Sequence, residues 1–297
     1  MPQLSIVVPT FNEAGNVAEL RNRVAAALPG VDWEMIYVDD DSPDGTAATV
    51  RELAQRDSRL RCIHRIGRRG LSSACIEGML ASSAPIVAVI DADLQHDERL
   101  LPAMFDALRG DDLDIVVGSR YTEGGSMDGW DRTRAATSRF ATRLSRLVLK
   151  ADLQDTMSGF FMIRRAAVER CVRAGMSGVG FKILLDLFAT SPVPLRCREL
   201  PYEFRNRFSG ESKLDTMVAW EFFIMLLDHY LGRVVPIRFI AFSLACSVGA
   251  LANVGIATYL FDQRAYWLLS AIAGVLVGAV WNYAVTAVYT WKKPKSG

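Results

Sequence analysis

The pattern of apolar and polar positions divides the chain into two parts. Over about the first 210 residues, short apolar runs typical of strands alternate with longer segments whose apolar positions recur at helical spacing. This alternation predicts an α/β domain in which a mostly parallel sheet lies between helices. We predict strands at residues 4–8, 34–38, 60–64, 86–90, 114–118 and 159–163, and helices at 14–28, 45–56, 71–82 and 98–109.

Beyond residue 232 the pattern changes to two long uncharged segments, residues 239–261 and 266–291. Each is long enough to cross about 30 Å of hydrocarbon as a helix. The short connection between them predicts a helical hairpin, and only Arg264 adds a basic residue there. The positive-inside bias therefore predicts an integral membrane protein with two spans and both termini in the cytoplasm. The outer flanks carry Arg233, Arg238, Lys292, Lys293 and Lys295.

We therefore expect three regions: an α/β domain at residues 1–210, a linking helix at 211–232 and the hairpin at 233–297. The linking segment is apolar and aromatic but is interrupted by acidic residues. Trp220 and Tyr230 favour an amphipathic helix at the membrane surface, and a core helix of the α/β domain is the alternative.

Charge and cysteine content narrow the function classes. The whole chain has a formal net charge of +1, and basic residues exceed acidic ones by five in the hairpin region. The rest of the chain therefore carries four more acidic than basic residues. An acidic body argues against nucleic-acid binding. The five cysteines show no metal-ligand spacing, which predicts reduced, mostly buried thiols. One basic stripe at helical spacing fits either anionic headgroups or a solvated face. It comprises Arg139, Arg143, Arg146 and Lys150.

Acidic residues follow two predicted strands at their carboxyl ends, where open α/β sheets bind ligands. The fourth strand is followed by Asp91 and Asp93, and the second by Asp39, Asp40 and Asp41. Carboxylates one residue apart suit a divalent cation shared with substrate phosphates, although they could also cap the loop. Those after the second strand can accept hydrogen bonds from a ribose or a base.

Several motifs, taken in order, resemble the inverting glycosyltransferases of family 2. The similarity covers residues 4–231 and is strongest to the branch of dolichol-phosphate mannose synthases and bacterial polyprenyl-phosphate glycosyltransferases. The hydrophobic tail is similar to the first half of a small four-span membrane domain often fused to these enzymes. The motifs are VVPTFNEAGNV, VDDDSPDGT, RRGLSSACIEGM, DADLQH, GSRY, SGFFMIRR and RFSGESKL.

The resemblance implies a GT-A-type, Rossmann-like nucleotide-sugar fold and a set of site residues. The implied ligands of a divalent cation, magnesium or manganese, are Asp91, Asp93 and Gln95, which would also engage the donor diphosphate. The implied donor-binding positions further include Pro9, Phe11, Glu13, Asp39, Asp40 and Lys213. The acceptor phosphate would be bound by Arg120, Arg134 and Ser138. The implied catalytic residues are Asp93, Arg120 and Arg207, the last in a loop that closes with Lys213 over the diphosphate.

These features predict a membrane enzyme that moves one sugar from a nucleotide-sugar, GDP-mannose or a UDP-hexose, to a polyprenyl phosphate at the cytosolic face. The attacking phosphate is already an anion, so positioning and charge stabilisation would suffice without a strong base. Two alternatives stay open: a glycosyltransferase with a hydroxyl acceptor, and a non-catalytic membrane partner of a sugar-lipid flippase. We expect His96 to pack or to act through its neighbours. Asn253 and Asn282 should hydrogen-bond between helices, which favours self-association of the hairpin.

Overall fold

The computed structural model describes residues 1–122, 126–127, 153–176, 178, 183–205, 237–263 and 266–289. The chain forms two compact units, Met1–Phe222 and Phe223–Gly297.

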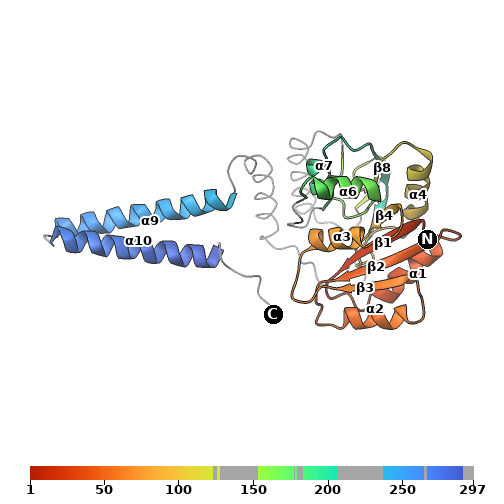
Figure 1. Cartoon of the computed structure of the whole chain (residues 1–297), viewed down its shortest axis with the longest axis horizontal. Helices are drawn as coiled ribbons and strands as arrows, with labels where there is room; N and C mark the ends of the chain where they lie inside the picture. Colours follow the sequence, from red (N-terminus) through yellow and green to blue (C-terminus); the bar gives the residue numbers. More distant parts are fainter. Residues whose placement is uncertain are drawn as a thin grey trace. The chain divides into compact units, whose positions relative to one another are not determined.

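A seven-stranded sheet forms the centre of the first unit, in the order β3-β2-β1-β4-β7-β5-β8 (Figure 1). Strand β7 runs antiparallel to β4 and β5, and the other neighbouring strands of this sheet are parallel. The strands are β1 (Leu4–Thr10), β2 (Trp33–Asp39), β3 (Leu60–His64), β4 (Ile86–Val89), β5 (Ile115–Ser119), β7 (Phe161–Arg164) and β8 (Cys197–Pro201). A second, two-stranded parallel sheet pairs β6 (Ser126–Met127) with β9 (Glu203–Phe204).

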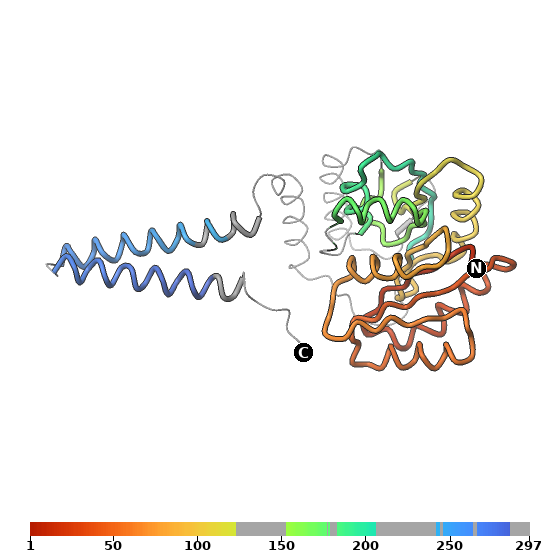
Figure 2. Tube along the Cα trace, viewed as in Figure 1, coloured from red at the N-terminus to blue at the C-terminus, as the bar shows by residue number. Residues whose placement is uncertain are grey.

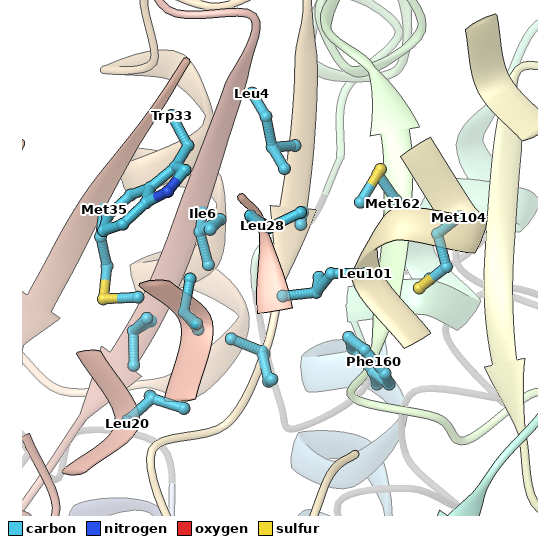
Figure 3. Close-up of a cluster of buried hydrophobic side chains, with 14 of the residues drawn as sticks. Leu4, Ile6, Leu20, Leu28, Trp33, Met35, Leu101, Met104, Phe160 and Met162 are labelled. Atoms are coloured by element: carbon cyan, nitrogen blue, oxygen red, sulfur yellow. The ribbon is translucent and has the colours of Figure 1, made fainter. Parts of the chain in front are cut away.

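Helices cover both faces of the large sheet because side chains alternate in direction along each strand. Leu4 and Ile6 of β1 face a core that includes α1 (Val17–Ala27), α2 (Thr46–Ala54) and α4 (Leu101–Gly110). Figure 3 shows part of this core, with Trp33 and Leu101 among the labelled side chains. Val7 faces the opposite core, formed with α3 (Leu71–Leu80), α6 (Arg165–Arg173) and α7 (Ile183–Thr190). A 3₁₀ turn, Glu98–Leu100, precedes α4.

The predicted α/β architecture with a mostly parallel sheet is confirmed, and the first five strands lie where the apolar runs predict them. Among the described elements of the first unit, five were not predicted: β6, β8, β9, α6 and α7. Strand β8 lies at the sheet edge and carries Arg198 and Glu199, so it lacks the apolar run of a central strand. Helix α6 carries four charged residues among its nine, and three of its residues are buried. The reversed direction of β7 has no signature in its own four residues.

The second unit contains two helices that lie side by side in antiparallel directions, α9 (Ile237–Asp262) and α10 (Trp267–Tyr289) (Figure 2). Small residues allow this close approach. A Cβ at Gly278 would lie 2.9 Å from the carbonyl oxygen of Gly249, and one at Gly274 would lie 2.5 Å from Oδ1 of Asn253. The side chain of Asn282 likewise lies against Gly249. Both asparagines therefore lie against the neighbouring helix, and the expected hydrogen bonds between the helices stay a prediction.

Among the described residues, one stretch is long and apolar enough to cross a membrane, Trp267–Val285 in α10. The apolar part of α9, Cys246–Asp262, is shorter. Many large apolar side chains of the two helices are exposed, including Leu251 and Trp267.

Candidate active site

The carboxyl ends of β1, β2, β4, β5 and β8 lie at one edge of the sheet because these strands run in the same direction. The chain passes from β1 to β2 and β3 on one side and returns to β4 on the other side of β1. Open α/β sheets bind ligands outside the carboxyl ends of the strands at such a reversal. Because β7 is antiparallel, the segment before it also reaches this edge.

The turn after β4 holds Asp91 and Asp93 in different environments. The Asp93 side chain is buried, and its Oδ1 accepts a hydrogen bond from the backbone N–H of Gln95 at 3.2 Å. Leu94, between Asp93 and Gln95, adopts a positive φ of 62°, which closes the turn. The Asp91 side chain is 35% exposed, and a Cβ added at Gly159 would lie 2.8 Å from its Oδ2. The more exposed carboxylate thus packs closely on a glycine.

His96 connects this turn to the segment between β8 and β9. Its Nε2 lies 3.1 Å from Oδ2 of Asp91, and its Nδ1 lies 2.8 Å from the hydroxyl of Tyr202. The ring is buried, with centroids 5.3 Å from Phe160 and 5.5 Å from Phe204. This placement agrees with the expectation that His96 packs or acts through its neighbours.

Arg205 holds the same turn from a second side. Its backbone N–H donates to the carbonyl of Gln95 at 2.9 Å, and the Gln95 Nε2 donates to the carbonyl of Arg205 at 3.1 Å. The guanidinium of Arg205 is paired with Asp97 at 2.8 Å and Glu98 at 3.0 Å. Local sequence gives no signal for these contacts, because 110 positions separate the two partners.

The predicted nucleoside carboxylates are engaged within the protein. Asp39 is fully buried and accepts hydrogen bonds from Thr10 Oγ1 at 3.2 Å and from the backbone N–H of Ser42 at 3.0 Å. Asp40 accepts from Arg65 Nη1 at 2.5 Å and from the backbone N–H of Gly70. Burial raises the pKa of Asp40, although its hydrogen bonds oppose that shift. These two carboxylates therefore order the loops at this edge of the sheet.

Other donor-binding candidates lie at the end of β1 and in the loop that follows it: Pro9 is the last residue but one of the strand, and Phe11 and Glu13 belong to the loop. The Arg69 guanidinium lies over the ring of Phe11, 4.3 Å from its centroid. Glu13 accepts a hydrogen bond from Asn16 Nδ2 at 2.7 Å. The contact between Arg69 and Phe11 joins the segments that follow β3 and β1.

Arg120 follows β5 and makes a buried ion pair with Asp155. Its Nε and Nη2 donate to the two carboxylate oxygens at 2.8 Å each, and its backbone N–H donates to Oδ2 at 3.1 Å. Glu199 accepts from the backbone N–H of Asp155 at 2.8 Å. Burial alone would lower the pKa of Arg120, but the charged hydrogen bonds to Asp155 outweigh it and raise that pKa. The guanidinium therefore stays charged. Asp155 is a residue that sequence patterns missed.

The carboxylates after β4 fit a shared divalent cation. Within the described part of the chain, no group of three or more His, Cys, Asp and Glu side chains could hold a metal ion. Asp91 and Asp93 are nevertheless two hard oxygen donors on one turn, and the Oδ1 of Asp91 is not used by His96. One or two carboxylates combined with substrate phosphates is the way proteins commonly bind Mg²⁺. The donor set therefore suits a cation completed by a diphosphate.

Several predicted positions lie outside the described residues. They are Arg134, Ser138, Arg207 and Lys213, the basic stripe at 139–150 and the linking helix at 211–232.

The family model for glycosyl transferase family 2 matches residues 5–172. This chain belongs to glycosyltransferase family 2, and it is therefore a glycosyltransferase.

Among characterised relatives, a dolichol-phosphate mannosyltransferase of Pyrococcus furiosus is 32% identical over 99% of this chain and 83% of its own length. A dolichol-phosphate mannosyltransferase of Saccharomyces cerevisiae is 34% identical over 78% of this chain and 88% of the relative. A polyprenol monophosphomannose synthase of Mycolicibacterium smegmatis is 31% identical over 70% of this chain and 80% of the relative.

A solved structure with a similar fold is glucosyl-3-phosphoglycerate synthase of Mycobacterium tuberculosis, in complex with Mn²⁺, UDP and glucosyl-3-phosphoglycerate. Its TM-score is 0.53 at 19% identity, covering 78% of this chain and 80% of that chain. This likeness confirms the GT-A-type fold.

Proposed function

We propose that this chain transfers one sugar from a nucleotide-sugar to a polyprenyl phosphate. The observation that carries the proposal is the similarity to the Pyrococcus furiosus dolichol-phosphate mannosyltransferase over 99% of this chain. Mannosyl relatives from an archaeon, a yeast and a mycobacterium favour mannose as the sugar, hence GDP-mannose as the donor. The edge that holds Asp91, Asp93 and Arg120 is where both substrates would meet.

A divalent cation, Mg²⁺ or Mn²⁺, belongs to this proposal. Asp91 and Asp93 would hold it with Oε1 of Gln95, whose Nε2 already donates to Arg205. When bound, such a cation offsets negative charge on the donor diphosphate. The Mn²⁺ in the solved mycobacterial neighbour supports a cation for this fold.

The remaining chemistry is positioning of the acceptor. A polyprenyl phosphate attacks with an oxygen that is already anionic, so the protein need not remove a proton. Arg120 keeps its charge and is held rigidly by Asp155, which suits it to aim a phosphate. Arg134 and Ser138 are proposed to join it, and Arg207 and Lys213 to cover the diphosphate. Attack opposite the leaving group would invert the anomeric carbon.

The hairpin would keep the enzyme at the membrane that contains its lipid acceptor. Helix α10 has the length and composition of a membrane span, and α9 lies against it. We propose that both helices span the bilayer, with the α/β unit and both termini on the cytosolic side. The flanking basic residues support this orientation. The outward-facing apolar side chains could also support a homo-oligomer.

The test is transfer by the purified full-length chain in lipid nanodiscs, with GDP-mannose, UDP-glucose or UDP-galactose as donor. Polyprenyl phosphate and polyprenol are compared as acceptors, and products are identified by mass and anomeric configuration. We expect inverted mannosyl phosphopolyprenol with the phosphate acceptor and none with polyprenol. Transfer to polyprenol alone would support the hydroxyl-acceptor alternative. Absence of Mn²⁺-dependent transfer with every donor would refute the proposed activity.

A further inference from the structure

We propose that His96 and Tyr202 are positioning residues that fix the orientation of the Asp91 carboxylate for cation binding. The proposal rests on the proposed function, because it assumes that Asp91 holds a cation. Its evidence is a continuous chain of contacts from Tyr202 through His96 to Asp91, in which the distances are 2.8 and 3.1 Å.

The direction of each hydrogen bond follows from the groups involved. An ionised carboxylate has no hydrogen to give, so the Nε2–H of His96 must donate to Oδ2 of Asp91. A neutral imidazole has one N–H, so Nδ1 of His96 must then accept from the hydroxyl of Tyr202. Burial raises the pKa of Tyr202 far above its usual value, which keeps that hydroxyl protonated. Tyr202 thereby selects the tautomer that holds Asp91.

The surroundings make this arrangement rigid. His96 and Tyr202 are each 4% exposed, so water has little access to replace a lost partner. The His96 ring is enclosed by Phe160, Tyr202 and Phe204 at centroid distances of 5.3–5.6 Å. Gly159 lies against the same oxygen of Asp91 that His96 contacts. With Oδ2 held from two sides, Oδ1 is the oxygen offered to a cation.

Such support affects metal affinity in a measurable way. Groups that orient a metal ligand typically contribute 10- to 100-fold to affinity, because the ligand no longer has to be ordered on binding. We therefore expect His96→Ala to weaken Mn²⁺ binding about 10- to 100-fold. His96→Gln keeps an N–H at the reach of Nε2 and should recover part of this loss. Tyr202→Phe removes only the hydroxyl, so a smaller loss is expected.

The experiment measures Mn²⁺ affinity by electron paramagnetic resonance of the free ion, with the full-length chain and saturating GDP but no acceptor. Tyr37→Phe is the matched control. Tyr37 is a buried tyrosine of β2, and its hydroxyl donates a hydrogen bond to the carbonyl of Val17 at 2.9 Å. We expect Tyr37→Phe to lower thermal stability about as much as Tyr202→Phe while leaving Mn²⁺ affinity unchanged.

A folded His96→Ala protein with Mn²⁺ affinity within twofold of wild type would overturn the inference. If His96→Ala does not fold, unchanged affinity in both His96→Gln and Tyr202→Phe would overturn it equally. Wild-type protein that binds no Mn²⁺ with GDP would overturn the cation assignment and this inference with it. Because no acceptor is present, a wrong choice of acceptor leaves the result unaffected.

Discussion

Gly159→Ala should impair transfer while leaving the fold intact. The φ of Gly159 is not positive, so alanine fits its backbone. The added Cβ would lie 2.8 Å from Oδ2 of Asp91, whereas ordinary contact begins at 3.4 Å. The carboxylate must therefore move by about 0.6 Å. The three nearest atoms to this Cβ all belong to the Asp91 side chain, so the strain falls on one carboxylate.

The size of the effect follows from that displacement. Functional groups must be held within about 0.5 Å of the productive geometry, and a shift of about 1 Å can cost 100-fold in rate. We therefore expect a loss of about 10-fold or more in transfer rate, together with weaker Mn²⁺ binding. Asp91 is partly exposed and can yield, so the free energy of unfolding should change by less than about 1 kcal/mol.

Two other glycines serve as controls. A Cβ at Gly78 would overlap Val7 Cγ1 and lie 2.9 Å from Val38 Cγ2, in the buried core. Overpacking there costs about 1–3 kcal/mol, partly offset by about 1 kcal/mol from helix propensity. Gly78→Ala should therefore lower stability without changing Mn²⁺ dependence. A Cβ at Gly110 would have no atom within 4 Å, so Gly110→Ala should change neither stability nor Mn²⁺ dependence.

The assay combines transfer rates over a range of Mn²⁺ concentrations with denaturant unfolding of the same three variants. The reasoning fails if Gly159→Ala matches Gly110→Ala in both rate and Mn²⁺ dependence. It also fails if the activity loss of Gly159→Ala merely follows a loss of stability like that of Gly78→Ala.

Three further predictions concern other parts of the chain. Asp155→Asn removes the charged partner of Arg120, so the transfer efficiency with polyprenyl phosphate should fall about 10- to 100-fold. GDP affinity measured by calorimetry should stay near that of the wild type. An equal loss of transfer efficiency and GDP affinity would contradict this prediction. Hydrogen bonds from Arg59, then from Arg21, hold the pKa of Asp57 below its usual 3.8, so its stabilisation is present above that pH and lost as pH falls below it. The stability deficit of Asp57→Asn should accordingly shrink between pH 7 and pH 3, and a constant deficit in urea unfolding would disprove it. Gly278→Leu should separate α10 from α9 and lower heat stability in detergent, with Gly255→Leu as the unaffected control, since nothing lies within 4 Å of that position.

Local patterning predicts the part of the fold that depends on burial. Strands β1, β2 and β4 are buried along their whole length because they pack between two helical layers, so their apolar runs could be recognised in the sequence. The edge strand β8 and helix α6 could not be recognised in the sequence, because solvent-exposed charged residues interrupt their apolar positions. The direction of β7 depends on its pairing with β4 and β5, which are distant in the sequence, so local patterning does not predict it.

The candidate site divides in the same way. Asp91 and Asp93 could be found because a strand that ends in acidic residues is a local signal. Asp39 and Asp40 were equally visible, but their hydrogen-bond donors come from other loops, so their burial could not be foreseen. Tyr202 lies 106 positions from His96, and only the folded sheet brings the two side chains together.

The ion pair between Arg120 and Asp155 also closes a loop of the chain. Arg120 follows β5 and Asp155 precedes β7, so two positions that are 35 apart in the sequence lie at one place on the sheet edge. Because both ends are fixed at one place, the entropic cost of closing the intervening segment grows only slowly with its number of residues. We expect this segment to behave as an exchangeable cassette. A segment exchanged between the two residues must still supply a strand that pairs with β9, as β6 does.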